Sequence, residues 1–126
     1  MIRTQGLDVR DLSFRYHVDE VLSDLSFQAG GGRVIGVLGA NGAGKSTLFK
    51  LILGILPLQK GEILVNGTRL GDLSARRRAR EMAYIPQSET GTFPFSVFEV
   101  VLMGTTVSFG LFSQPGKKER KKAEEA

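Results

Sequence analysis

The most informative stretch of the chain runs through nine residues, Gly39-Ala40-Asn41-Gly42-Ala43-Gly44-Lys45-Ser46-Thr47. Its first eight residues match G-x-x-x-x-G-K-[ST], the pattern of a phosphate-binding loop between a strand and a helix. Glycines let the backbone curl so that successive N–H groups point into one concavity and bind phosphate oxygens. The N-terminus of the following helix adds a partial positive charge. The stretch therefore predicts a site for the phosphates of a nucleotide.

Three side chains in this loop carry the expected chemistry. Lys45 would reach the β- and γ-phosphates of ATP as a point charge, the Ser46 hydroxyl would ligate Mg²⁺, and Thr47 would offer a hydroxyl to the α-phosphate. The alternative is a glycine-rich turn without function. Three glycines, a lysine and a hydroxyl at fixed spacing after an apolar run favour the phosphate loop over that alternative.

The segments on either side of the loop fit this interpretation. Residues 34–38 form a continuous apolar run, which predicts a central strand covered on both faces. Residues 48–56 are apolar nearly all round and are followed by Pro57, so we expect a buried helix packed on that strand and ended by the proline.

Two further pairs of strands are expected outside this core. Leu12, Phe14 and Tyr16 alternate with polar residues, and residues 21–27 alternate in the same way, which indicates an antiparallel pair joined by a short polar connection. Residues 62–65 and 68–70 flank an Asn-Gly dipeptide, which favours a two-residue type I′ hairpin turn.

The second half of the chain alternates helix and strand signals. A short arginine-rich helix is expected from Ser74, and residues 82–85 predict a strand ended by a proline. Ser96 and Glu99 match a capping box at the start of a helix that runs through Met103. Residues 117–126 are strong helix formers without a stop signal, so we expect the 126 residues to be part of a longer protein.

Composition excludes several classes of protein. The chain has 126 residues, a net charge of +4 and no cysteine, which excludes disulfide and thiolate chemistry. It holds no apolar run of about 20 residues and no apolar segment of a signal peptide near Met1, so we expect a cytosolic address. The basic side chains gather at residues 76–80 and in the last ten residues, without aromatic neighbours, and we interpret them as solvated helix faces and not as a nucleic-acid site.

The flanks of the loop distinguish among the nucleotide-binding families. The chain resembles the ATP-binding cassette (ABC) transporter ATPases through the loop and through four other segments, Leu12-Ser13-Phe14-Arg15-Tyr16, Lys60-Gly61-Glu62-Ile63, Asn66-Gly67 and Tyr84-Ile85-Pro86-Gln87. The resemblance implies an α/β fold of the P-loop NTPase type: an antiparallel β portion at residues 1–32, part of the P-loop core at 33–92 and the start of a helical subdomain at 93–126.

The same resemblance implies roles for two residues and several partners. Tyr16 would stack on adenine, and Gln87 would help to coordinate Mg²⁺ and the attacking water. Residues 93–104 are similar to ATPases that import iron-siderophore, haem or cobalamin-type substrates. The 87–104 region, with Phe93, Phe95 and Phe98, would dock the membrane-spanning permease subunits, although these phenylalanines could equally be local core. The complete protein would pair with a second ATPase subunit on the inner face of the membrane.

Parts of the family's catalytic machinery do not occur among the 126 residues. No Asp or Glu follows four consecutive apolar residues, and no Leu-Ser-Gly-Gly-Gln segment is present. The sole histidine, His17, precedes the phosphate loop, whereas the family's catalytic histidine comes far downstream of it. Because hydrolysis needs a carboxylate to polarise the attacking water, we expect this chain alone to bind Mg·ATP without turnover.

Two alternatives stay open at this point. The chain could be a non-catalytic or regulatory nucleotide-binding module that pairs with another subunit. A kinase or GTPase with the same loop is disfavoured because no Asn/Thr-Lys-x-Asp segment, which reads guanine, occurs in the sequence.

Overall fold

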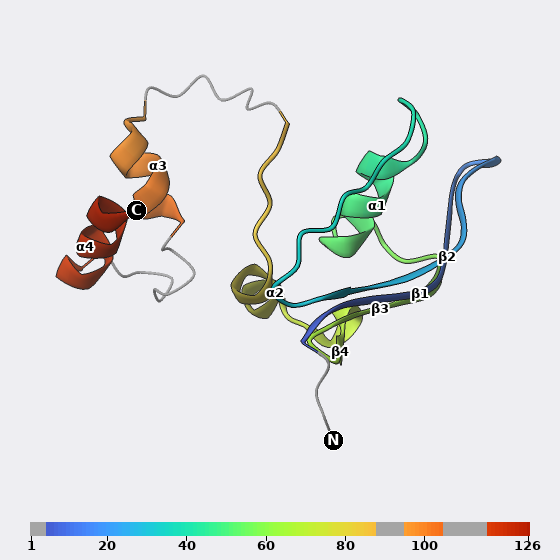
Figure 1. Cartoon of the computed structure of the whole chain (residues 1–126), viewed down its shortest axis with the longest axis horizontal. Coiled ribbons are helices and arrows are strands. Elements are labelled where there is room, and N and C mark those ends of the chain that lie inside the picture. The colour runs from blue at the N-terminus through green and yellow to red at the C-terminus, as the bar shows by residue number, and fades with distance from the viewer. Residues whose placement is uncertain (1–4, 88–94, 105–115) are drawn as a thin grey trace. The chain divides into compact units, whose positions relative to one another are not determined.

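The computed structural model describes residues 5–87, 95–104 and 116–126, and the chain divides into two compact units, residues 1–82 and 83–126. The first unit contains a four-stranded sheet in the order β2-β1-β3-β4 and the helices α1 and α2 (Figure 1). The second unit contains α3 and α4. The division of the chain at residues 32 and 92 stays a prediction.

The sheet begins with a long antiparallel hairpin, as predicted. Strand β1 (Gly6–Tyr16) pairs with β2 (Asp19–Gly30), and Phe14 lies opposite Leu22 in the register. The turn between the strands consists of two residues, of which His17 has a positive φ of 54°. A first turn residue with positive φ suits the twist of a two-residue hairpin.

A second, shorter hairpin extends the sheet on the other side of β1. Strands β3 (Lys60–Val65) and β4 (Thr68–Arg69) flank Asn66 and Gly67, which have φ of 50° and 77°. Positive φ at both turn residues is the requirement of the type I′ turn, so this prediction is confirmed. The Asn66 side chain also accepts a hydrogen bond of 2.8 Å from the Gly6 N–H, which joins the hairpin to the start of β1.

The pairing of β3 with β1 brings two backbones unusually close. Gly61, on β3, has a φ of 95°, and a Cβ at this position would lie 2.5 Å from the Arg10 carbonyl oxygen. Both the conformation and the space require glycine here. Nearby, the Lys60 ammonium lies 2.6 Å from an Asp24 carboxylate oxygen and so reaches from β3 to β2. This contact raises the pKa of Lys60 and lowers the pKa of Asp24.

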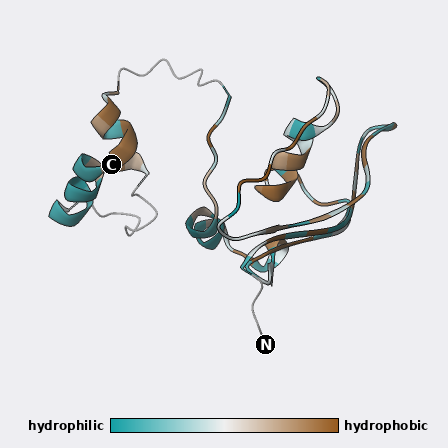
Figure 2. Ribbon diagram, viewed as in Figure 1, coloured by the Kyte–Doolittle hydropathy of each residue, from teal (hydrophilic) through white to brown (hydrophobic). Residues whose placement is uncertain are grey.

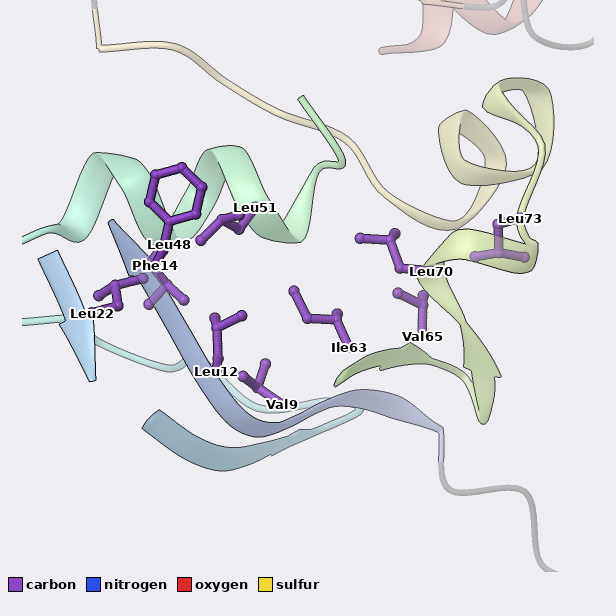
Figure 3. Packing of buried hydrophobic residues seen from close by; sticks show 10 residues of the cluster. All are labelled: Val9, Leu12, Phe14, Leu22, Leu48, Leu51, Ile63, Val65, Leu70 and Leu73. Atoms are coloured by element: carbon purple, nitrogen blue, oxygen red, sulfur yellow. The ribbon is translucent and has the colours of Figure 1, made fainter. Parts of the chain in front are cut away.

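Helix α1 (Lys45–Ile52) covers one face of the sheet (Figures 1 and 3). Leu48 and Leu51 point from the helix toward Leu12, Phe14 and Leu22 of the long hairpin (Figure 3). The core cluster is completed by Val9, Ile63, Val65, Leu70 and Leu73, which are all buried. The helix is thus buried along one side only, whereas the apolar run at 48–56 predicted burial nearly all round.

The helix differs from the prediction in its partner and in its end. It packs on β1 and β2 and not on a strand at residues 34–38, and Phe49 is 42% exposed. It ends at Ile52 and does not continue to residue 56. The reason is Gly54, whose φ of 69° breaks the helix before Pro57 is reached. Two N–H groups, of Ile55 and Leu56, then bond the same carbonyl, that of Lys50.

Two predicted strands are wrong. Residues 34–38 belong to no strand, and Leu38 is 94% exposed. Residues 82–86 are likewise not a strand, and Ile85 is 91% exposed. A strand needs a neighbour for its N–H and C=O groups, and every strand of the described residues pairs within the antiparallel sheet. Both segments keep the apolar character of buried strands, which appears as brown in Figure 2.

Helices α2 and α3 start at the serines that the sequence predicted, Ser74 and Ser96. A 3₁₀ turn, η1 (Leu70–Asp72), leads into α2 (Ala75–Glu81), and the Ser74 hydroxyl accepts a hydrogen bond of 3.3 Å from the Arg77 N–H. In the second unit, α3 (Val97–Met103) begins with the predicted capping box, and α4 (Lys117–Glu125) contacts α3. Within the described part of the chain, no helix has both the length and the apolar character to cross a bilayer.

Candidate functional site

The phosphate loop connects the exposed segment 34–38 to the first turn of α1. Gly42 and Gly44 have φ of 83° and 89°, a region that side chains disfavour. The Ala43 N–H donates to the Ala40 carbonyl over 3.1 Å, and the Leu48 N–H donates to the Gly44 carbonyl over 2.9 Å. The first bond closes the turn, and the second begins the helix at the end of the loop.

Gly44 fixes the loop to the sheet. A Cβ on this residue would lie 2.9 Å from Val21 Cγ1 and 3.1 Å from Leu22 Cδ2. Gly44 itself is buried, and Thr47 and Leu48 after it are buried too. Gly44 therefore lies directly against β2, and only glycine lets the start of α1 come that close to the strand.

Lys45 turns back into the curve of the loop. Its ammonium donates hydrogen bonds to the Gly39 carbonyl and, over 2.6 Å, to the Ala40 carbonyl. A Cβ on Gly39 would lie 3.2 Å from the Ala43 Cβ and 3.9 Å from the Lys45 Nζ. The Lys45 ammonium thus places a positive charge in the curve of the loop, beside the Gly39 and Ala40 carbonyls.

The two hydroxyls of the loop differ in access. Ser46 is exposed in the first turn of α1, whereas Thr47 is only 8% exposed. Among the described residues, no group of three or more His, Cys, Asp or Glu side chains could hold a metal ion. Mg²⁺ is commonly held by one or two protein oxygens together with substrate phosphates and several waters, and the Ser46 hydroxyl fits such a site.

Tyr16 lies at the tip of the hairpin that supports the loop. It is the last residue of β1, and its ring is 40% exposed. The ring packs edge-on against Phe14, with centroids 5.0 Å apart and an interplanar angle of 80°. Phe14 pairs with Leu22, the residue that Gly44 approaches. An exposed aromatic ring and the buried end of the phosphate loop are therefore held by the same part of one hairpin.

The other predicted site residues lie outside this arrangement. Gln87 is exposed and belongs to the second unit, which is described by itself, so its role stays a prediction. In the proposed docking region, Phe95 is exposed and Phe98 is partly buried, while Phe93 lies outside the described residues. Within the first unit, Tyr16 and the loop are thus linked through Phe14 and Leu22 of the hairpin.

Two contacts of the site could not be predicted from the sequence. Val21 and Leu22 form the support of Gly44, and Gln59 bonds the backbone next to Tyr16. The alternating pattern of residues 21–27 indicated a strand but not which strand lies under the loop. Nothing in the local sequence marks Gln59, because its partner is 44 residues away.

Comparison with known proteins gives a consistent result. The sequence model of the family described as ABC transporter matches residues 22–126. The zinc transport system ATP-binding protein TroB of Treponema pallidum is 41% identical over 123 residues, which are 96% of this chain and 44% of that protein. The hemin import ATP-binding protein HmuV of Gloeobacter violaceus is 42% identical, over 100% of this chain and 43% of that protein.

Solved structures agree with these relatives. A metal-chelate type ABC transporter in an inward-facing conformation superposes with a TM-score of 0.75 and 30% identity, over 97% of this chain and 43% of that one. The ATP-binding subunit of an ABC transporter gives a TM-score of 0.69 and 36% identity, over 85% of this chain. The fold is that of these P-loop NTPases, and the chain spans less than half the length of the curated relatives above.

Proposed function

The chain belongs to the ABC transporter family, and from this premise we propose that residues 39–47 bind the phosphates of Mg·ATP. The observation that carries the proposal is the position of the Lys45 ammonium inside the curve of the loop, bonded to the Gly39 and Ala40 carbonyls. The present acceptors of this cation are neutral carbonyls, and phosphate oxygens that enter the same space would replace them with acceptors of opposite charge, which bind an ammonium more strongly.

Each loop residue has a part in this proposal. The backbone N–H groups from Gly39 to Gly44 and the N-terminus of α1 would surround the β-phosphate, and Lys45 would lie between the β- and γ-phosphates. Ser46 would ligate Mg²⁺, which neutralises charge on the β- and γ-phosphates when it is bound. Thr47 is buried, so a contact from its hydroxyl to the α-phosphate would use the small part of the residue that is exposed.

We assign the adenine to Tyr16. Its partly exposed ring offers a surface to a base, and the contact with Phe14 holds the ring in place. Stacking of a base on an aromatic side chain contributes about 1–3 kcal/mol and suits any purine. Gln87 would complete the site by helping to hold Mg²⁺ and the attacking water, as the family resemblance implies.

At the level of the whole protein, we propose an ATP-binding subunit of an importer. Relatives are named for the transport of zinc and manganese, iron chelatin and hemin, which favours a metal ion, a metal chelate or haem as the transported substrate; cobalamin extends the same proposal. The subunit would pair with a second ATPase subunit and with membrane-spanning permease subunits at residues 87–104, on the cytoplasmic face of the membrane.

We further propose that the 126-residue chain binds Mg·ATP without hydrolysing it. Within these residues, no acid follows four consecutive apolar residues, the position from which the family resemblance implies that a carboxylate polarises the attacking water. A non-catalytic module that regulates another subunit would share this property. A partner of fixed stoichiometry that co-purifies with the chain would favour the regulatory module.

The test is calorimetric titration of the chain with Mg·ATP. Lys45→Ala removes a charge-assisted bond of about 1.5–3 kcal/mol and should weaken binding about 10- to 150-fold. Lys50→Ala is the matched control, because Lys50 is an exposed lysine on the same helix outside the loop. The affinity of this variant for Mg·ATP should equal that of the parent chain. Equal loss in both variants, or no binding by the parent, would refute the assignment of the loop. Phosphate release that Lys45→Ala abolishes would refute the absence of turnover.

A further inference from the structure

The Gln59 side chain bonds the backbone of β1 at the residue before Tyr16. Its Oε1 accepts a hydrogen bond of 2.8 Å from the Arg15 N–H, and its Nε2 donates one of 3.0 Å to the Arg15 carbonyl oxygen. Both polar atoms of one side-chain amide thus serve both polar groups of one backbone residue. A residue in an antiparallel strand receives the same pair of bonds from its partner across the ladder.

This contact lies where the neighbouring strand ends. The last pair between β1 and β3 is Ser13 with Lys60, and β3 begins at Lys60. Arg15 lies two residues further along β1, where a longer β3 would supply a backbone partner. The side-chain amide of Gln59 bonds the Arg15 backbone there instead. The side chain therefore extends the paired edge of β1 by one step, up to the residue next to the tip of the hairpin.

The other restraints on the tip come from pairing with β2 and from the contact of the Tyr16 ring with Phe14. Tyr16 pairs with Asp19 across a two-residue turn, and the ion pair of Arg15 with Glu20 is long, at 3.9 Å, and exposed on both sides. An exposed ion pair of this kind contributes little to order. On the side of β1 that faces β3, Gln59 supplies the two backbone hydrogen bonds nearest to Tyr16 among those the structure describes.

We propose that Gln59 is a positioning residue for the base of the nucleotide: it holds the backbone of Arg15, and thereby the ring of Tyr16, in the orientation that receives adenine. The inference rests on the proposed function of the loop and of Tyr16. Gln59 touches neither the phosphates nor the base in this scheme, and it acts only by keeping the hairpin tip in its bound form before ATP arrives, which lowers the ordering cost of binding.

The first test compares ATP with inorganic tripolyphosphate, which carries the phosphates without a base. Gln59→Ala removes both bonds and should weaken Mg·ATP binding about three- to tenfold, the equivalent of about one net hydrogen bond, while Mg·tripolyphosphate binding stays unchanged. Gln59→Glu keeps the size of the side chain but turns a carboxylate oxygen toward the Arg15 carbonyl, so it should weaken ATP binding at least as much. Equal loss for both ligands would mean general damage to the loop and would overturn the inference.

The second test is a double-mutant cycle. In the Tyr16→Ala background, Gln59→Ala should have no further effect on ATP affinity, because the ring that it positions is gone. A loss that persists in that background would overturn the inference. A normal ATP affinity of Tyr16→Ala would also overturn it but would leave the assignment of the loop intact, since that assignment depends on Lys45.

A third measurement needs no ligand. The chain has two tyrosines, so Tyr84→Phe leaves Tyr16 as the sole tyrosine fluorophore. The fluorescence anisotropy of Tyr16 should fall when Gln59→Ala is added, because the tip then moves more freely on the nanosecond timescale. Unchanged anisotropy would overturn the inference, whatever the nucleotide titrations show.

Discussion

Substitution of Gly44 by alanine tests how the phosphate loop is built onto the sheet. Gly44 combines a φ of 89° with a Cβ position 2.9 Å from Val21 Cγ1 and 3.0 Å from the Val21 carbonyl oxygen. Gly42 has nearly the same φ, 83°, but nothing lies within 4 Å of its Cβ position. The two variants Gly44→Ala and Gly42→Ala therefore share the strain of the backbone and differ in the collision with β2.

The expected difference follows from separate terms. A left-handed conformation costs a residue with a Cβ about 1–2 kcal/mol, and alanine lowers the entropy of the unfolded chain by about 0.4–1 kcal/mol. Both terms apply to both variants and cancel in the comparison. The collision forces α1 away from Val21 or distorts the strand, and overpacking of this kind costs about 1–3 kcal/mol. Gly44→Ala should be less stable than Gly42→Ala by that amount.

The assay is urea unfolding of the two variants and the parent, with midpoints compared at equal slope. Binding of Mg·ATP supplies a second readout, because displacement of α1 also moves Lys45 and Ser46 away from residues 39–44 of the loop. If Gly44→Ala and Gly42→Ala had the same midpoint, the close approach of the loop to β2 would not exist in solution. The support of the loop by Val21 and Leu22 would then be refuted.

Two other predictions address the core and the capping box. Leu51 is fully buried and Ile55 is exposed. In urea unfolding, Leu51→Ala should therefore lower the free energy of unfolding by about 2–5 kcal/mol, and Ile55→Ala by at most about 0.5 kcal/mol. Similar losses in the two variants would contradict the core assignment. The bonds from the Ser96 backbone and hydroxyl lower the pKa of Glu99. The capping box is therefore fully formed above the ordinary glutamate pKa and is lost as the pH falls through the lowered value of the folded state. An NMR titration of the Ser96 amide should show this midpoint, and Glu99→Gln should remove the transition; a midpoint at the ordinary pKa would count against the box.

The antiparallel part of the fold could be predicted because the sequence signals for it are local. The alternation up to Tyr16 and the Asn66-Gly67 dipeptide each describe a segment that is completed by a neighbour a few residues away, and the capping box of Ser96 closes within one turn. The end of α1 has two local signals, Gly54 and Pro57, and the helix ends at the first of them because Gly54 adopts a left-handed conformation.

The strands at 34–38 and 82–85 could not be predicted correctly from the same kind of pattern. A continuous apolar run states that a segment is suited to burial on both faces, but pairing depends on neighbours that the run itself does not contain. In the described residues neither segment has such a neighbour. The contacts of Gln59 with Arg15 and of Asn66 with Gly6 escaped prediction for a related reason, since each joins residues far apart in the chain and leaves no periodic trace.

The two flanks of the phosphate loop are therefore unequal, and this bears on how tightly the loop holds a ligand. Its C-terminal flank is fixed, because Gly44 lies against β2 and Leu48 and Leu51 are in the core. Its N-terminal flank continues from an exposed segment that ends at Leu38, and the bonds from Lys45 to Gly39 and Ala40 tie this side to the fixed one. A ligand that recruits the Lys45 ammonium competes with these bonds, so part of its binding free energy offsets the loss of the contacts between the two sides of the loop.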